Sequence, residues 1–515
     1  MSPTTSARAL AAVASGYTLS WVSPPSNLHY LHWFAFIPLL WALDPKDRKL
    51  NFRLGYLSGF TAVFFLFFWL ARTIDIFSNI PLWLSSLVVV LFALVWGLPY
   101  GVLATFIGPI RLHFPRAWIL LFPSCWVGIE LLWPSLFPYY QGVGQYRTPY
   151  IWQLASVFGA YGLTWLILAV NCAFVALLQE PRRPAIPLAV GALWFINLGF
   201  GWWRFNAVEA ELSAAPVARV SILQQGITMV ERLEDLRRDH GKTAFNSWVK
   251  LTEQLKGQEL DLVVWPEGAV PFNPHQGKAA EVMGKIATAG NFNFLVGGGT
   301  SEPSPDEPKR RLHWNSTYLF DRSGKVSGRY DKMVPLPFGE YLPWPLGFLR
   351  NYIEGPGNFR AGNTPYVFQT DRFSFTVPIC YEAILEDQMR RLSDGDVFVN
   401  ITNDGWFGDT DAPHQHAMLS AAYAVELGRP MLRIGYTGIS MVVEPHGVIR
   451  EETQPYTDVA KVVELRVATY NTPYRTWGRA FPWVCALISL AAVFRSRRAL
   501  AANPAPPVTD PPAPT

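Results

Sequence analysis

Long apolar runs fill the first part of the chain, and shorter alternating runs follow them. Up to about residue 204, successive runs are long enough to be predicted as helices across the roughly 30 Å hydrocarbon core of a bilayer. One more apolar run covers residues 480–494 and ends in a basic cluster. Together these runs predict an α-helical membrane bundle of about eight transmembrane helices. The seven N-terminal runs lie near residues 9–23, 29–43, 54–72, 81–109, 117–135, 150–178 and 185–203.

The polar stretch between the seventh and eighth runs has a different period. Short β-branched or aromatic runs alternate there with helical stretches, which is typical of an α/β domain whose helices cover a sheet. The predicted helices are Glu231–Gln258, Gly277–Ala289 and His414–Leu427. The predicted strands are Val217–Leu223, Leu260–Trp265, Phe292–Gly297, Trp314–Asp321, Phe373–Ile379 and Val397–Thr402.

These patterns divide the chain into four parts. Residues 1–215 are predicted as a membrane domain with seven transmembrane helices, and residues 216–472 as a soluble domain. Residues 473–501 carry the last transmembrane helix, and the Pro-rich tail 502–515 is predicted to be disordered. No cleavable signal peptide is expected, because the first run lacks a clear small-residue cleavage site and further apolar runs follow it.

Basic residues orient the predicted helices. Lys and Arg precede the first run and gather in alternate loops, whereas the other loops are poor in them. The positive-inside rule therefore places both termini in the cytoplasm. After seven crossings the soluble domain is expected outside, on the periplasmic side of a bacterial inner membrane. The basic residues are Arg8, Lys46, Arg48, Lys49, Arg53, Arg111, Arg116, Arg182, Arg183, Arg495, Arg497 and Arg498.

Composition agrees with a chain that is part membrane protein and part soluble protein. Hydrophobic residues make up 50% and charged residues 16% of its 515 positions, which is too apolar for an ordinary soluble enzyme. The net charge of +4 neither favours nor excludes an anionic partner. Cys125, Cys172 and Cys485 fall in apolar runs, so no disulfide framework is expected and Cys380 is the only thiol of the polar part.

Three side chains of the soluble domain carry candidate chemistry. Glu267 follows the apolar run Leu262–Trp265, where a partly desolvated carboxylate suits a general base, although a salt bridge or a cap is the alternative. Lys332 precedes a loop with two prolines and a glycine, and it suits either oxyanion stabilisation or a solvated surface. Cys380 ends a predicted strand and suits a nucleophile, although buried thiols are often inert.

Three further residues are candidates for a supporting role. Glu340 either supports catalysis or simply pairs with Lys332. Tyr381 and Glu382 directly follow Cys380. Glu382 either orients Lys332 or forms a surface ion pair.

Other motifs give weaker signals. His414 and His416 have the His-x-His spacing of a zinc site, but without a complementary cluster a helix-start or packing role is favoured. Gly297–Gly299 lacks the spacing of a nucleotide-binding loop. Glu130 lies inside an apolar run, where a carboxylate either serves function or hydrogen-bonds near the outer interface. The apolar loop 341–349 is expected to dip into lipid or to form a lid.

Three strings, taken in order, resemble the nitrilase superfamily. They are Trp265-Pro266-Glu267; Tyr330-Asp331-Lys332 with Pro337-Phe338-Gly339-Glu340; and Cys380-Tyr381-Glu382. The membrane helices narrow the resemblance to the apolipoprotein N-acyltransferase family, and it extends over nearly the whole chain apart from the tail. Further matching strings are Phe158–Leu163 with Asn171, Asn403–Gly408, Pro413–His416 and Glu426–Pro430.

The resemblance implies an αββα sandwich with a Glu-Lys-Cys triad. It assigns Glu267 as the general base, Lys332 as the ammonium that stabilises an oxyanion, and Cys380 as the nucleophile. The same resemblance implies no metal ion and no other cofactor. Its supporting or substrate-binding residues are Glu340, Tyr381 and Glu382.

The implied reaction is a ping-pong transfer through a thioester. A phospholipid would donate a fatty acyl chain, and the α-amino group of the diacylglyceryl-cysteine of a lipoprotein would accept it. The resemblance implies a monomer in the membrane without nucleic acid. The alternatives are a membrane-tethered amidase, in which water resolves the intermediate, and a non-catalytic scaffold.

Two departures from the family pattern keep a divergent paralogue open. Gln224–Ile227 lacks the usual Asn, and Arg232 stands about where a Trp is usual. The string Gly435–Gly438 also lacks the usual Asn before its last glycine. These changes concern acceptor recognition or lid behaviour more than the acyl chemistry.

Overall fold

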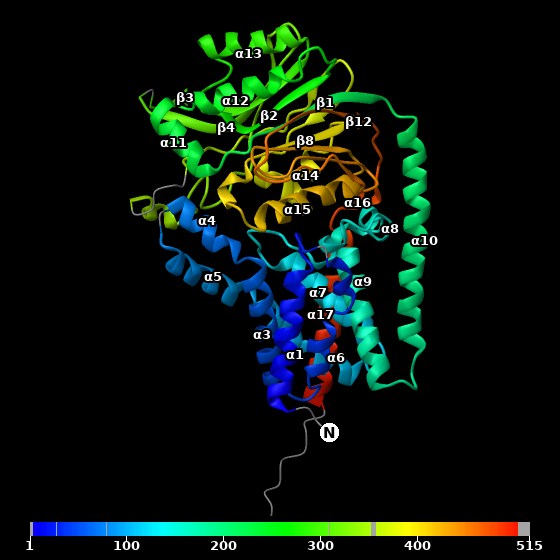
Figure 1. The fold of residues 1–515 in the computed structure, drawn as a ribbon. Coiled ribbons are helices and arrows are strands. Elements are labelled where there is room, and N and C mark those ends of the chain that lie inside the picture. Colours follow the sequence, from blue (N-terminus) through cyan, green and yellow to red (C-terminus); the bar gives the residue numbers. More distant parts are fainter. Residues whose placement is uncertain (1–3, 27, 79, 308, 352–356, 503–515) are drawn as a thin grey trace, which may run out of the picture.

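The computed structural model describes residues 4–26, 28–78, 80–307, 309–351 and 357–502. A bundle of helices forms one end of the molecule, and an α/β sandwich forms the other (Figure 1). Most of the tail expected to be disordered, residues 503–515, lies outside the described residues. The side chain of Leu349, in the loop expected to meet lipid, lies outside them too.

The bundle contains helices at most of the predicted apolar runs, although several runs are divided between two helices. Helices α1, α3, α6, α7, α9 and α17 pack together, and the long α10 contacts α9 along one edge before it leads into the sandwich (Figure 1). The helices are α1 (Thr5–Trp21), α2 (Ile37–Ala42), α3 (Arg48–Leu66), α4 (Trp69–Ser78), α5 (Leu82–Trp96), α6 (Leu98–His113), α7 (Trp118–Leu132), α8 (Pro149–Trp152), α9 (Ala155–Gln179), α10 (Ala185–Ser213) and α17 (Ala480–Ala502).

Only some of these helices pass a strict test for a membrane span. Within the described residues, three stretches are long and apolar enough, namely Leu82–His113, Ala155–Gln179 and Ala185–Ser213. A fourth is the pair α3 and α4, which is bent by 47°. The apolar parts Trp118–Leu132 of α7 and Ala480–Ser496 of α17 are shorter. Helix length and composition therefore do not by themselves establish eight crossings.

The second predicted run, residues 29–43, is not one helix, and that prediction was wrong. It folds as a 3-10 turn, η1 (His29–Trp33), followed by the six-residue α2. Pro38 lies in the first turn of α2 and lacks a backbone N–H. Asn171 of α9 satisfies the break, because its amide accepts from the N–H of Phe36 and donates to the carbonyl of His32.

Two six-stranded sheets form the sandwich, which confirms the predicted α/β fold. Their strand orders are β12-β1-β2-β3-β4-β5 and β11-β10-β9-β8-β7-β6. The sheets face each other through contacts of β1 and β2 with β8 and β9. The strands are β1 (Val217–Gln224), β2 (Leu262–Val270), β3 (Asn293–Pro303), β4 (Arg311–Phe320), β5 (Val326–Asp331), β6 (Phe368–Gln369), β7 (Ser374–Thr376), β8 (Val397–Thr402), β9 (Met431–Gly435), β10 (Met441–Val443), β11 (Ile449–Arg450) and β12 (Val459–Arg466).

Helices cover both outer faces of the sandwich. The predicted helix Glu231–Gln258 is in fact two, because His240 and Gly241 both take left-handed backbone angles between α11 and α12. On the opposite face, α15 lies between the second sheet and the membrane bundle (Figure 1). These helices are α11 (Met229–Asp239), α12 (Lys242–Glu253), α13 (Gly277–Gly290), α14 (Glu386–Arg391), α15 (Ala412–Leu427) and α16 (Pro473–Trp477).

The sandwich and the bundle share one hydrophobic core. Buried residues of α9, such as Ala160 and Leu163, belong to the same cluster as Met418 of α15 and Val399 of β8. Because α15 is buried on all sides, it joins the two domains rigidly. A site on this side of the sandwich therefore lies next to the membrane helices.

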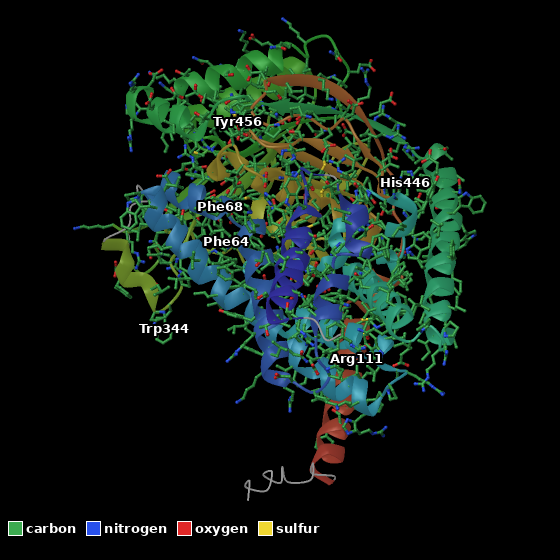
Figure 2. All side chains as sticks on the ribbon, turned by 60° about the horizontal axis from the view of Figure 1, so that its bottom comes forward. Phe64, Phe68, Arg111, Trp344, His446 and Tyr456 are labelled. Atoms are coloured by element: carbon green, nitrogen blue, oxygen red, sulfur yellow. The ribbon has the colours of Figure 1, made fainter. Side chains whose placement is uncertain are left out.

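The apolar loop between β5 and β6 is exposed as the sequence suggested. Trp344 is 93% exposed and Phe348 is 59% exposed. Figure 2 shows Trp344 at the edge of the molecule, on the same side as Phe64 and Phe68 of the bundle. That this loop enters lipid or closes as a lid stays a prediction.

Candidate active site

Glu267 lies where β2 loses its regular pairing with β3. The register of the two strands shifts after Trp265, and Gly268 takes a positive φ of 62°. The Glu267 side chain is buried, and contacts from both sheets hold it. Its Oε2 accepts from the N–H of Asn403 at 2.9 Å, and its Oε1 accepts from the Asn315 amide at 2.7 Å.

Lys332 follows β5 and lies between two carboxylates. Its Nζ is 2.7 Å from Glu340 Oε2 and 3.4 Å from Glu267 Oε1. The residue is only 1% exposed, so the possibility of a solvated surface lysine is wrong. Burial disfavours the ammonium, but the charges of Glu340 and Glu267 outweigh it and raise the pKa of Lys332 above its ordinary value. Lys332 is therefore a fixed positive charge.

Cys380 begins the short 3-10 turn η4 (Cys380–Ile384), directly after the second sheet's strand segment ends. Its φ of 50° is left-handed, a conformation that costs free energy in a residue with a side chain. Burial raises the pKa of the Cys380 thiol, and the negative charge of Glu267 raises it further, while Lys332 opposes them. The resting sulfur is thus a protonated thiol, and it needs a base to become a nucleophile.

Glu382 ties the Cys380 turn to the segment that follows Lys332. Its Oε2 accepts from the N–H of Ile379 at 2.8 Å, and its Oε1 accepts from the N–H of Met333 at 2.7 Å. Burial raises the pKa of Glu382 to about 7, and these backbone donors oppose the shift. Glu382 is fully buried, so the alternative of a surface ion pair is wrong.

Sequence reasoning missed Asn315 of β4. Its Nδ2 donates to Glu267 Oε1 and to Glu340 Oε1, both at 2.7 Å. It therefore holds the two carboxylates on either side of Lys332. The only available signal was a polar residue inside the predicted strand Trp314–Asp321, and such residues are frequent.

His416, the second histidine of the His-x-His string, has a packing role. His416 Nδ1 lies 2.7 Å from Asp404 Oδ1, and its Nε2 lies 3.2 Å from the Cys380 carbonyl oxygen. Arg433 donates to the other oxygen of Asp404 at 2.7 Å. This buried network supports the backbone of the Cys380 turn, and sequence reasoning did not predict it.

Gln415, between the two histidines, binds the membrane bundle. Its amide donates to the Leu66 carbonyl and accepts from the indole of Trp69, both at 3.0 Å. The bond to Leu66 satisfies a backbone carbonyl where α3 ends, which explains how the bend before α4 is tolerated. Among the described residues, His414 and His416 belong to no metal-like cluster; the single such group, in a different place, is Glu209, Glu444 and His446.

Arg232, which stands about where a Trp is usual in the family, packs against the second unusual string. The Arg232 guanidinium stacks on the Tyr436 ring with 4.5 Å to the ring centroid, and it donates to the carbonyl of Gly268. Tyr436 belongs to the second unusual string, so the two departures lie in contact. Arg232 thus packs beside the loop that carries Glu267.

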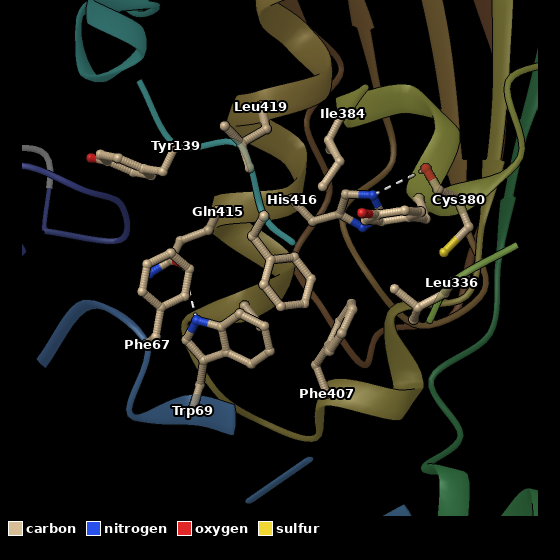
Figure 3. A pocket seen from close by; sticks show the side chains of 13 residues that line it. Phe67, Trp69, Tyr139, Leu336, Cys380, Ile384, Phe407, Gln415, His416 and Leu419 are labelled. Carbon is tan, nitrogen blue, oxygen red and sulfur yellow. Dashed lines mark hydrogen bonds between the residues drawn. The ribbon is translucent and has the colours of Figure 1, made fainter. Parts of the chain in front are cut away.

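An apolar pocket opens beside Cys380 (Figure 3). Residues of the membrane bundle form part of its wall, and residues of the sandwich form the rest. Tyr381 joins the two parts, because its hydroxyl donates to the Leu136 carbonyl at 2.6 Å. The pocket is lined by Phe67, Trp69, Phe137, Tyr139, Leu336, Cys380, Tyr381, Ile384, Phe407, Ala412, Gln415, His416 and Leu419.

Comparisons with known proteins match both domains. Residues 15–173 match the apolipoprotein N-acyltransferase N-terminal domain, and residues 223–470 match carbon-nitrogen hydrolase. The apolipoprotein N-acyltransferase of Geobacter metallireducens is 30% identical and covers 95% of each chain. That of Brucella melitensis is 29% identical and covers 94% of this chain and 93% of its own.

A solved amidase from Nesterenkonia sp. is 19% identical, with a TM-score of 0.35, and covers 51% of this chain and 94% of its own. The relative from Geobacter metallireducens spans both the helical bundle and the sandwich. The chain therefore belongs to the apolipoprotein N-acyltransferase family.

Proposed function

We propose that this enzyme transfers a fatty acyl chain from a phospholipid to the α-amino group of a lipoprotein's diacylglyceryl-cysteine. One observation carries the proposal: the buried thiol of Cys380 lines an apolar pocket whose wall is partly membrane helix, and it is influenced by the charges of Glu267 and Lys332, which lie 3.4 Å apart. An acyl chain suits such a wall because apolar surface gains by leaving water. A small polar amide would gain little from it.

In the first half-reaction, the Cys380 sulfur attacks the ester carbonyl carbon of the phospholipid while Glu267 takes the thiol proton. The carbonyl oxygen becomes an oxyanion, and the Lys332 ammonium stabilises it. The ester C–O bond then breaks. Glu267 returns its proton to the leaving oxygen, a lysophospholipid departs, and the acyl chain remains on sulfur as a thioester.

In the second half-reaction, the neutral α-amine of the acceptor attacks the thioester carbon. Glu267 takes a proton from the amine, and Lys332 again stabilises the oxyanion. The C–S bond breaks, the sulfur takes the proton from Glu267, and an amide leaves. The thioester already carries the activation, so the chain's own residues suffice for the proton transfers.

Glu340, Glu382 and Tyr381 position these groups. Glu340 offsets the charge of Lys332, and Glu382 fixes the Cys380 turn. Tyr381 lines the pocket and anchors it to the membrane domain.

The function is tested by following the acyl group. Purified full-length protein incubated with a phospholipid labelled in its acyl chain is expected to gain one hydroxylamine-sensitive acyl group on Cys380, seen by mass spectrometry. A diacylglyceryl lipopeptide should then remove the group and become N-acylated. If water removes the group as fast as the lipopeptide does, and no amide forms, the protein is a hydrolase instead.

We also propose eight membrane crossings, with residues 216–472 on the periplasmic side of the inner membrane and the protein acting as a monomer. The broken second segment supports a crossing, because Arg8 at the start of α1 donates to the Ala42 carbonyl at the end of α2. The chain therefore crosses the bundle along α1 and returns to the end of the bundle where α1 begins by residue 42. The basic loops support the orientation.

Cysteine labelling tests this topology. All four native cysteines are buried, so an exposed new thiol gives a clean signal. In spheroplasts, a membrane-impermeant maleimide is expected to label Lys256→Cys of the sandwich at once. Arg183→Cys, between α9 and α10, should react only after the membrane is opened. The reverse pattern would contradict the orientation.

A further inference from the structure

A second cavity lies inside the membrane bundle, directly beside the pocket of Cys380. Phe67, Phe137 and Tyr139 line both spaces. Figure 3 shows Phe67 and Tyr139 on the side of the pocket far from Cys380, with the Tyr139 hydroxyl pointing away from the sulfur. The two spaces are therefore neighbours across one aromatic wall.

This cavity contains polar groups that its protein neighbours leave unused. Oε1 of Glu130 accepts from the Trp126 indole at 3.1 Å and from the N–H of Gln141 at 3.0 Å. Oε2 of the same carboxylate is buried and has no hydrogen-bond partner among the described residues. The indole nitrogens of Trp96 and Trp133, which also line the cavity, are buried without a partner too.

Buried polar atoms without a partner are rare, and several around one cavity indicate an absent ligand or water. The unused groups are one carboxylate oxygen, which accepts, two indole N–H groups, which donate, and the Tyr139 hydroxyl, which can do either. The described lining contains no Lys or Arg, so the cavity does not suit a bare anion. It suits a group that donates to Glu130 and has an oxygen nearby for the indoles.

The depth of the cavity fits a lipid head group. Glu130 lies in the last turn of α7, on the side of the bundle that faces the sandwich. Trp96, Trp133 and Tyr139 add the aromatic side chains that gather at the level of the head groups. These features match the polar level of a bilayer, where the head group of a lipid lies.

We propose that this cavity binds the amino group of a lipid substrate, with Glu130 as acceptor and the indoles of Trp96 and Trp133 as donors to a neighbouring oxygen. The inference rests on the proposed acyl transfer. Two lipid-linked amines enter that reaction. One is the ethanolamine amine of a donor head group, and the other is the α-amine of the acceptor. Both share the same chemistry, and the experiment distinguishes them.

The first arm compares two donors. Glu130→Gln removes the charge and keeps the size of the side chain. Acyl-adduct formation on Cys380 is measured against the concentration of phosphatidylethanolamine or phosphatidylglycerol with identical acyl chains. If the site takes the head-group amine, the KM for phosphatidylethanolamine rises about tenfold, as expected for a lost bond to a charged group. The KM for phosphatidylglycerol then changes less than twofold.

The second arm compares acceptors after the enzyme has been acylated. If the site takes the acceptor's α-amine, Glu130→Gln leaves both donors unchanged and raises the KM for the diacylglyceryl lipopeptide about tenfold, with kcat retained. Glu180→Gln, which removes an exposed carboxylate of the membrane domain outside this cavity, is the matched control and is expected to change neither arm.

Two results would overturn the inference. One is an equal change in KM for both phospholipid donors with no change in KM for the lipopeptide, which means that the carboxylate only supports the fold or holds water. The other is no change in either arm. If Glu130→Gln does not fold, the same measurements are made with Trp133→Phe, which removes one donor and keeps an aromatic ring. A change in KM that is no larger for the amine-bearing substrate than for phosphatidylglycerol rejects the site. Failure of the acyl transfer itself is distinct, since the unmodified enzyme would then form no adduct with either lipid.

Discussion

Replacing Cys380, the proposed nucleophile, is expected to have the largest effect. Cys380→Ala should form no acyl adduct, and lipopeptide acylation should fall by a factor on the order of 10⁴ or more. The reason is that no other group in the pocket can carry the acyl chain. The fold should survive, because Glu382 and His416 hold the turn through the backbone of residues 379 and 380 and not through sulfur.

A matched variant separates the lost chemistry from lost packing. Cys172→Ala removes another fully buried thiol, in α9, and should retain activity. Normal acyl transfer by Cys380→Ala would rule out the covalent route. Equal losses in both variants would point to packing as the cause.

The raised pKa of the Cys380 thiol predicts how its alkylation rate depends on pH. Because the pKa of Cys380 is raised, the thiolate is scarce at neutral pH and becomes common only above the usual range of a thiol. Alkylation by a small, uncharged iodoacetamide should therefore accelerate continuously as the pH rises from 7 to 9, without a plateau. A plateau below pH 8 would show a thiolate stabilised at rest, and the base would then be unnecessary.

Loss of the ammonium is expected to have the second largest effect, and it acts in two ways. Lys332→Met should slow acyl-adduct formation by about 10²–10³-fold, because the oxyanion loses its charge partner. It should also lower the free energy of unfolding by about 3–5 kcal/mol, because the Glu267 and Glu340 carboxylates remain buried without a cation. The rate of acyl-adduct formation measures the first effect, and thermal unfolding measures the second.

A double variant separates them. Lys332→Met with Glu340→Gln removes one of the two stranded charges, so much of the lost stability should return. Activity should not return, since the positive charge at the oxyanion is still missing. Recovery of both would show that Lys332 acts only as a structural ion-pair partner. Lys332→Arg keeps the charge but not the compact shape, and it should recover stability better than rate.

Local sequence patterns predicted only part of the sandwich, and β12 shows one reason for the strands that were missed. Strands β1, β2, β3, β4 and β8 lie close to the predicted runs. Strand β12 was not predicted, because it is formed by antiparallel pairing with β1, more than two hundred residues away. Such pairing depends on contacts that a local window does not contain.

The same limit applies to the membrane bundle. An apolar run predicted one helix at residues 29–43, but Pro38 interrupts it and Asn171 of α9 satisfies the break. At the end of α3, Gln415 of α15 does the same for the carbonyl of Leu66. In both places a distant polar side chain makes a broken helix acceptable, and hydropathy does not register that side chain.

The sequence alone determined which chemical groups this protein has and the order in which they occur: an acid after a buried strand, a lysine before a proline-fixed loop, and one thiol in the polar part. Their residue types and local periods are properties of short segments, so short segments sufficed. Only the tertiary structure decided that Lys332 lies between Glu267 and Glu340, that Asn315 holds both carboxylates, and that the pocket is shared with the bundle. Those facts depend on distances between segments far apart in the chain, and packing of the two sheets and α15 sets these distances.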